Sequence, residues 1–300
     1  LTFCISGNMC ADKYEIGGQS SLSGAILRLV SKKGAKSMTR IFFASDLHGS
    51  DVCWRKFLNA GRFYKADVLI LGGDMTGKAL VPVVQGTDGN YTIMRPEGIL
   101  LLRDETEVVA AEQQIANRGY YPFRTTAQEI ERLSSESDQL DALFHSLMRR
   151  RVEEWMALAD ERLAESDILC YVCPGNDDQF EVDEIIARSK RVRLTEGQVI
   201  TLPEGHEMIS TGWSNPTPWN TYRETDEESL RARIEELAAQ VKNMDLAIFN
   251  LHAPPYGSCL DEAPDLDENL KPRHAGQISV PVGSQAVYEV IMAYQPLVSL

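Results

Sequence analysis

The segment Ile41-Phe-Phe-Ala-Ser-Asp-Leu-His-Gly49 carries an apolar strand pattern directly into side chains that can bind a metal ion. Its first half is apolar and aromatic, as expected for a buried strand. Asp46 and His48 are two positions apart, so they project to the same side of an extended segment. Both side chains can therefore contact one cation, and the pattern predicts a strand that ends at a functional site.

Three more apolar segments end in side chains of the same kind. Asp74 follows the segment 67–72, Asn176 follows 168–173, and His252 follows 246–251. Each motif alone is common in turns and loops, but ligands of open α/β sheets bind outside the carboxyl ends of the strands. We therefore predict one shared metal site, and its candidate ligands are Asp46, His48, Asp74, Asn176 and His252.

Strand and helix patterns alternate from residue 38 onward, which indicates a layered α/β fold. The turn Thr87-Asp-Gly-Asn90 predicts a hairpin between strands 80–85 and 91–95. Helical spacing of apolar residues predicts a helix over 104–117, and one long helix or two over 125–165. We expect residues 104–165 to be a helical insertion between core strands.

Residues 1–37 differ in composition from the rest of the chain. They are rich in Ser, Gly and Lys, contain five Lys and Arg against two Asp and Glu, and show no clear apolar periodicity. The first convincing strand pattern follows Met38. We expect residues 1–37 to be an upstream or disordered extension and residues 38–300 to be the folded domain; the alternative is a functional tail.

Composition excludes several classes of protein. The 300 residues are 43% hydrophobic and 25% charged, as in globular domains, and the net charge of −14 disfavours nucleic acid and anionic membrane surfaces as partners. We find no run of 18 apolar residues and no signal-peptide pattern, so we expect a cytoplasmic protein. Cys170 and Cys173 form a C-x-x-C motif within an apolar strand, which favours core packing over zinc binding.

The strand-end motifs resemble those of the calcineurin-like metallophosphoesterases. That family shows D-x-H, then G-D, then G-N-[H/D/C], then a strand-end His, then a terminal G-H-x-H, and four of these five blocks occur between residues 46 and 252. Residues 212–219 and 251–257 also look like a microbial branch of the family. The resemblance implies a four-layer α/β/β/α sandwich and two divalent metal ions.

The resemblance also implies a role for each candidate ligand. Asp46 and His48 would bind the first metal, Asp74 would bridge, and Asn176 and His252 would bind the second. A metal-bound hydroxide would attack a phosphoester in line, since two metal ions lower the pKa of water and hold the phosphoryl oxygens. Asp, Asn and His ligands suit Mn²⁺, Fe or Zn²⁺ better than Ca²⁺.

The sequence departs from the family pattern at two places. Asp177 stands where the family often has a His that protonates the leaving oxygen, and an Asp is mostly ionised at neutral pH. Asp177 is therefore a weak catalytic candidate, and orienting a ligand is an equal alternative. The chain also ends at Leu300, within a predicted strand and without G-H-x-H, so we expect that it is truncated at its C-terminus.

These observations predict a dinuclear-metal-dependent phosphomonoesterase or phosphodiesterase acting on a small molecule or a phosphoprotein. The alternative is an impaired phosphoesterase scaffold that serves as a protein-binding module. For the three remaining histidines we expect no functional role: His145 on a helix surface, and His206 and His274 in loops. The alternative for His274 is contact with a phosphate.

Overall fold

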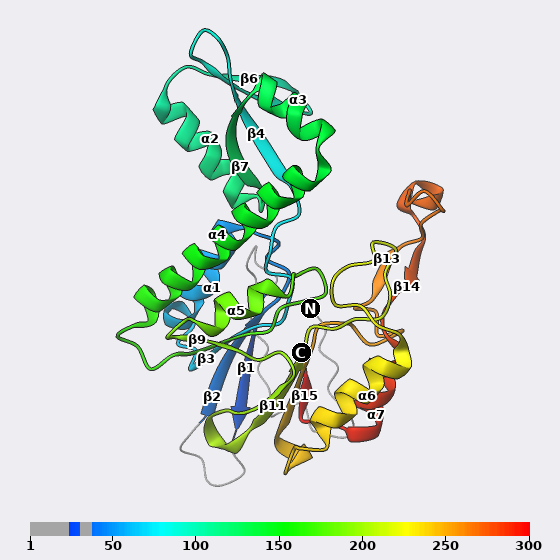
Figure 1. Cartoon of the computed structure of the whole chain (residues 1–300). Helices are drawn as coiled ribbons and strands as arrows, with labels where there is room; N and C mark the ends of the chain where they lie inside the picture. The colour runs from blue at the N-terminus through cyan, green and yellow to red at the C-terminus, as the bar shows by residue number, and fades with distance from the viewer. Residues whose placement is uncertain (1–23, 31–37) are drawn as a thin grey trace.

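The computed structural model describes residues 24–30 and 38–300 and shows a mixed α/β protein with several sheets (Figure 1). One sheet has the strand order β1-β2-β3-β8-β9. Its strands β2, β3, β8 and β9 are parallel, and β1 is antiparallel to β2. The bounds are β1 Gly24–Val30, β2 Met38–Ala44, β3 Val68–Leu71, β8 Leu169–Val172 and β9 Val192–Leu194.

A second sheet has the order β10-β11-β12-β15. Strands β11, β12 and β15 are parallel, and β10 pairs antiparallel with β11. The bounds are β10 Gln198–Thr201, β11 Glu207–Thr211, β12 Ala247–Leu251 and β15 Val298–Ser299, with short 3₁₀ turns η2 Pro203–Gly205 and η3 Met244–Leu246. The central strands of both sheets are almost fully buried, as expected for parallel sheets covered on both faces.

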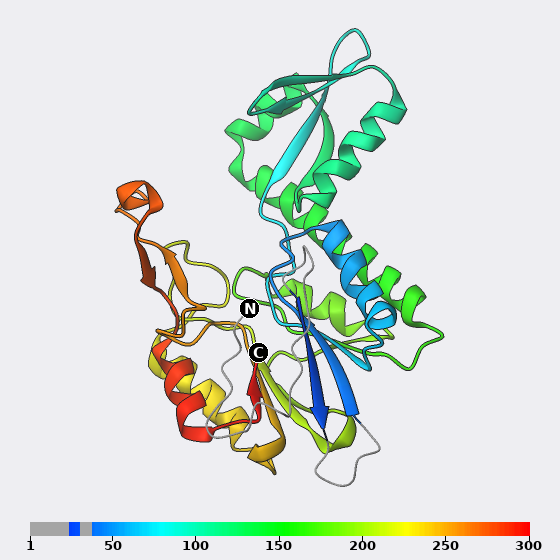
Figure 2. The same cartoon turned by 180° about the vertical axis from the view of Figure 1, so that it is seen from behind.

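The two sheets share one apolar cluster. Ile41 and Ile70 of the first sheet belong to the same buried cluster as Met208 and Ile248 of the second. On its other face the first sheet packs against α1 Asp51–Phe63, α4 Ser137–Leu163 and α5 Glu181–Ala187. The second sheet packs against α6 Glu227–Ala238 and α7 Gln285–Tyr294, and both views show these helices outside the sheets (Figures 1 and 2).

A separate small sheet lies within the segment between β3 and β8, at the top of Figure 1. Its order is β6-β5-β4-β7, and helix α2 packs on it through a cluster that contains Val83, Ile93 and Val108. The bounds are β4 Leu80–Gln85, β5 Tyr91–Arg95, β6 Gly98–Leu102, α2 Glu105–Asn117, β7 Tyr121–Thr126 and α3 Ala127–Ser135.

The predicted helical insertion over residues 104–165 is therefore wrong in two respects. The inserted unit begins at β4, and it contains a sheet as well as helices. Strand β7 was not predicted, since Pro122 is unfavourable in the interior of a strand. The structure places β7 at the edge of the sheet, where proline is tolerated. The hairpin of β4 and β5 is confirmed, and the long charged segment forms two helices, α3 and α4.

The expected extension 1–37 also needs correction. Seven of its residues form β1, which pairs with β2 along its full length, and Ala25 and Leu27 are buried. The apolar segment Gly24–Val30 is short and lies in a Ser-, Gly- and Lys-rich region, so its periodicity was not evident. Residues 1–23 and 31–37 lie outside the described part of the chain.

An arm leaves the second sheet between β12 and α7. It contains β13 Glu262–Pro264, the 3₁₀ turn η4 Arg273–Gly276 and β14 Ser279–Pro281, and it projects away from the sheets in both views (Figures 1 and 2). Across residues 24–30 and 38–300, every helix is too short or too polar to cross a membrane.

Candidate metal centre

The loops that follow β2 and β3 are joined by backbone hydrogen bonds. The amide of Asp46 donates to the carbonyl of Gly73 at 3.0 Å, and the amide of His48 donates to the carbonyl of Asp74 at 2.9 Å. These bonds continue the pairing of two parallel strands beyond their ends. The two loops therefore hold Asp46, His48 and Asp74 side by side. The strand-end pattern predicts this grouping, but the extended backbone expected at Asp46 and His48 is wrong, because β2 ends at Ala44 and both residues have a positive φ angle.

All three of these residues have a positive φ angle. The values are 59° for Asp46, 44° for His48 and 48° for Asp74. Residues other than glycine rarely adopt this left-handed backbone conformation, and each such residue costs on the order of 1–3 kcal/mol of conformational free energy. Such strain persists where the surrounding structure enforces it, which is typical of functional sites.

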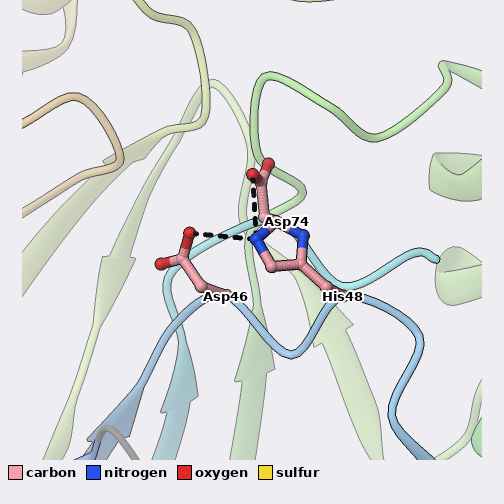
Figure 3. Close-up of side chains that lie close together, drawn as sticks. All are labelled: Asp46, His48 and Asp74. Atoms are coloured by element: carbon pink, nitrogen blue, oxygen red, sulfur yellow. Dashed lines mark ion pairs between the residues drawn. The ribbon is translucent and has the colours of Figure 1, made fainter. Parts of the chain in front are cut away.

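The three side chains surround a common point (Figure 3). His48 Nε2 lies 3.6 Å from Asp46 Oδ1 and 3.9 Å from Asp74 Oδ2, and the three candidate ligand atoms are all within 4.8 Å of one another. These separations are too long for hydrogen bonds. They suit atoms that each lie about 2.0–2.2 Å from one divalent cation. The group is therefore compatible with a divalent metal ion.

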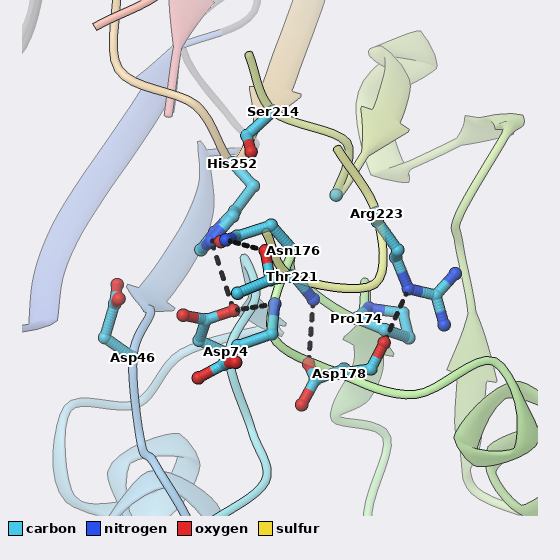
Figure 4. Close-up of polar contacts among 12 residues, drawn as sticks. Asp46, Asp74, Pro174, Asn176, Asp178, Ser214, Thr221, Arg223 and His252 are labelled. Carbon is cyan, nitrogen blue, oxygen red and sulfur yellow. Dashed lines mark hydrogen bonds and ion pairs between the residues drawn. The ribbon is translucent and has the colours of Figure 1, made fainter. Parts of the chain in front are cut away.

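The second oxygen of Asp74 faces a different pair of residues (Figure 4). His252 Nε2 lies 3.3 Å from Asp74 Oδ1 and 2.8 Å from the amide oxygen of Asn176. The backbone amide of Asp177 also donates to Asp74 Oδ1, at 3.0 Å. Asp74 thus has His48 on the side of one carboxylate oxygen and His252 on the side of the other, with Asp46 near His48 and Asn176 near His252. The structure brings all five predicted ligands together.

Two glycines leave the space that this arrangement needs. A Cβ atom on Gly73 would come within 2.2 Å of His252 Nδ1, and one on Gly175 would come within 2.3 Å of Asp74 Oδ1. Gly175 would also meet His252 Nε2 at 2.8 Å. A larger residue at position 73 would displace His252, and one at position 175 would displace both Asp74 and His252.

Asp74 and His252 form a buried pair of opposite charge. Burial alone would raise the pKa of Asp74, but its hydrogen bond to His252 and the nearby charge lower that pKa. Burial likewise disfavours the charged imidazole, but the hydrogen bond and charge of Asp74 raise the pKa of His252. The negative potential that favours a proton on His252 would equally favour a bound cation.

The amide of Asn176 is oriented by residues that the motif search did not select. Its Nδ2 group donates to Thr221 Oγ1 at 2.7 Å, and the Thr221 hydroxyl donates to Glu224 Oε1 at 2.5 Å. These two hydrogen bonds orient the side chain so that the amide oxygen of Asn176 faces His252. Thr221 and Glu224 lie just after the 212–219 segment noted for its family resemblance, which was the only signal for them in the sequence.

Asp178 holds together the two loops that carry Asp74 and Asn176. It is fully buried, and its carboxylate accepts hydrogen bonds from the amides of Met75, Thr76 and Gly175 and from the Thr76 hydroxyl. Its backbone carbonyl accepts a hydrogen bond from the buried guanidinium of Arg223 at 3.1 Å. Asp178 therefore holds the loops after β3 and β8 in place through their backbone amides, and we do not count it among the candidate metal ligands.

Asp177 has a partner that the sequence did not reveal. Its Oδ2 atom lies 2.6 Å from the ammonium group of Lys78, and the Lys78 side chain remains 58% exposed. At this distance the positive charge of Lys78 attracts the Asp177 side chain and holds it in place. The geometry therefore favours a role for Asp177 in positioning Lys78 and, through its amide, Asp74.

The other singled-out residues lie outside the centre. His145 is partly exposed on α4 and pairs with Glu181. His206 lies in the short loop between η2 and β11, as predicted, and it is buried there with its Nδ1 atom 3.1 Å from the carbonyl of Leu246. His274 lies in η4 of the arm. Cys170 and Cys173 are buried as expected, and burial raises the pKa of Cys170 to about 12.

Comparison with known proteins adds three findings. No protein-family model matches the sequence. The chain is 33% identical over 122 residues to the uncharacterized protein MJ1162 of Methanocaldococcus jannaschii; the match covers 40% of this chain and about half (51%) of that relative. Two solved structures each align over 85% of this chain. One aligns at 11% identity with a TM-score of 0.42 and is covered over 80% of its own chain. The other, TT1561 of Thermus thermophilus, aligns at 12% identity with a TM-score of 0.43 and is covered over 77% of its own chain.

Proposed function

We propose that this chain is a phosphoester hydrolase of the calcineurin-like metallophosphoesterase type that uses two divalent metal ions. The observation that carries the proposal is the position of Asp74. Its Oδ2 atom lies 3.9 Å from Nε2 of His48, in the group that also contains Asp46, and its Oδ1 atom lies 3.3 Å from Nε2 of His252, which in turn contacts Asn176. A carboxylate with a different histidine near each of its oxygens can contact two neighbouring metal ions at once.

The proposed architecture is a four-layer α/β/β/α sandwich. Its support is the packing of the two main sheets on each other, with α1, α4 and α5 outside one sheet and α6 and α7 outside the other. Three of the five candidate ligands follow β2 and β3 of the first sheet, Asn176 follows β8, and His252 follows β12 of the second. The centre thus lies where the carboxyl ends of both sheets meet.

In this proposal Asp46 and His48 would hold one ion, Asn176 and His252 would hold the other, and Asp74 would be shared between them. When bound, the ions would lower the pKa of water and neutralise charge on the phosphoryl oxygens. Oxygen and imidazole ligands favour Mn²⁺, Fe or Zn²⁺. Lys78 places an exposed cation beside Asp177, where it can contact an anionic substrate.

The pairing of Asp177 with Lys78 has a consequence for substrates. Because Asp177 is engaged by Lys78, we propose that it positions Lys78 and does not protonate the leaving oxygen. We expect esters with acidic leaving alcohols, such as p-nitrophenyl esters, to be hydrolysed fastest. Substrates are then small phosphoesters or phosphorylated proteins whose ester group can reach the centre.

The test is hydrolysis of p-nitrophenyl phosphate and bis(p-nitrophenyl) phosphate with added Mn²⁺, together with calorimetric titration of Mn²⁺. We expect Asp74→Asn to lower kcat/KM at least 100-fold and to reduce the number of ions bound, because an anionic ligand common to both ions is lost. Asp88→Asn is the matched control, since Asp88 lies in the exposed hairpin turn and bonds only with Asn90 among the described residues.

Each outcome has a distinct meaning. Full activity and unchanged Mn²⁺ stoichiometry in Asp74→Asn would refute the two-metal proposal. Mn²⁺ binding by the wild type without hydrolysis of either ester would favour the alternative, an impaired scaffold that binds other proteins.

A further inference from the structure

A cavity of about 600 Å³ lies between the inserted unit and the loops of the candidate metal centre. Strands β4 and β7 and helices α3 and α4 form its walls, and the segments after β3 and β8 form its other side. Both views show the inserted unit standing over these loops (Figures 1 and 2). A cavity of this size accommodates a small organic ligand.

The walls of the cavity are mainly apolar. Phe123 from β7, Leu133 from α3, and Leu140, Phe144 and Met148 from α4 all line it. Leu140 is 39% exposed even though it lies at the cavity, and the two aromatic rings offer flat apolar faces. Burying apolar surface contributes roughly 25 cal/mol per Å², so these walls would bind an apolar group in preference to water.

The polar end of the cavity adjoins the metal centre. Lys78 and Asp177 line it, and the amide of Asp177 bonds to Asp74 Oδ1 at 3.0 Å. Gln179 lines the same end; its side-chain amide nitrogen bonds to Tyr222 at 2.7 Å, while its buried Oε1 atom has no hydrogen-bond partner among the described residues. Lys78, Asp177 and Gln179 therefore give this end of the cavity polar groups.

We propose that this cavity binds the alcohol portion of the substrate, and that the substrate is a phosphoester of a bulky, apolar, aromatic alcohol. The inference rests on the proposed function, because it requires the phosphoryl group at the metal centre. The Asp177–Lys78 pair then lies at the junction, with the phosphoryl group on the Asp74 side and the apolar group against Phe123 and Phe144.

The experiment compares phenyl phosphate with 2-naphthyl phosphate, two esters with similar leaving groups but different apolar size. With Mn²⁺ present, we expect kcat/KM to be at least 10-fold higher for the naphthyl ester. Leu140→Trp, which places a large ring in the cavity, should reduce this preference at least 5-fold. Leu101→Trp is the matched control, because Leu101 is similarly exposed (41%) but lies on β6 away from the cavity.

A second measurement does not depend on hydrolysis. We expect the metal-free chain to bind 2-naphthol, followed by the fluorescence of the naphthol, and Leu140→Trp to weaken that binding at least 5-fold. If Leu140→Trp fails to fold, as judged by circular dichroism, Ile130→Trp introduces the same ring from α3.

The outcomes separate the two proposals. Equal kcat/KM for the two esters, with no binding of naphthol, would overturn the cavity assignment and leave the hydrolase intact. Naphthol binding that Leu140→Trp weakens, without hydrolysis of any ester, would support the cavity and refute the hydrolase. Naphthol binding that is insensitive to both tryptophan variants would place the ligand elsewhere and overturn the inference.

Discussion

Replacing Asp178 by Asn tests whether one buried carboxylate holds the candidate metal centre together. Four donors converge on this side chain: the amides of Met75 and Gly175 reach Oδ2 at 3.0 and 2.8 Å, and the amide and hydroxyl of Thr76 reach Oδ1 at 2.8 and 2.7 Å. An Asn side chain keeps one acceptor oxygen and replaces the other with an NH₂ group, which is a donor. Two buried donors therefore lose their acceptor.

The size of the effect follows from these contacts. Each buried donor without an acceptor costs about 1–3 kcal/mol, so two cost roughly 2–6 kcal/mol. An opposing contribution exists, because burial and then the charge of Asp74 raise the pKa of Asp178, and a neutral amide avoids that penalty. We expect Asp178→Asn to lower the free energy of unfolding by about 2–4 kcal/mol.

The assay is urea unfolding at neutral pH followed by tryptophan fluorescence, since Trp54 and Trp155 stack in the core with ring centroids 5.1 Å apart. Asp226→Asn is the control, because Asp226 caps α6 and also accepts two hydrogen bonds, from the amide and hydroxyl of Ser229. Asn caps helices as well as Asp, so this variant should keep the wild-type midpoint. A loss below about 1 kcal/mol in Asp178→Asn would refute the view that the loops depend on this carboxylate.

Two further predictions concern other parts of the fold. Leu27→Ala should lower the free energy of unfolding by about 2–4 kcal/mol, because Leu27 is buried in the cluster between the sheets. Urea unfolding of this variant is compared with that of the exposed-site control Leu101→Ala. Equal unfolding midpoints for the two variants would show that β1 is dispensable. Burial raises the pKa of Glu196, although the amide of Gly212 donates a hydrogen bond to its carboxylate. A group whose pKa is raised by folding contributes stability below its ordinary pKa, and this contribution is lost as the pH rises through the pKa of the folded state. The melting temperature of the wild type relative to Glu196→Gln should therefore fall between pH 4 and pH 8, and a constant difference would contradict the reasoning.

Local patterns were sufficient to predict the main strands and the candidate ligands. Asp46, Asp74, Asn176 and His252 each lie within four residues of the end of a strand, and parallel strands place their carboxyl ends at one edge of a sheet. The grouping of these residues could be predicted because it depends on strand ends and alternation along the chain, and both are visible in a short window of sequence.

Tertiary structure alone decided the features that join distant segments. Strand β1 gains its hydrogen bonds from β2, and β7 is a strand because β4 lies beside it, although Pro122 argues against one locally. Asp178 and Thr221 acquire their roles from donors and acceptors far away in the sequence, and Lys78 meets Asp177 across almost a hundred residues. Such contacts leave no periodic signal, because their free energy depends on which groups meet in space and not on the order of neighbouring residues.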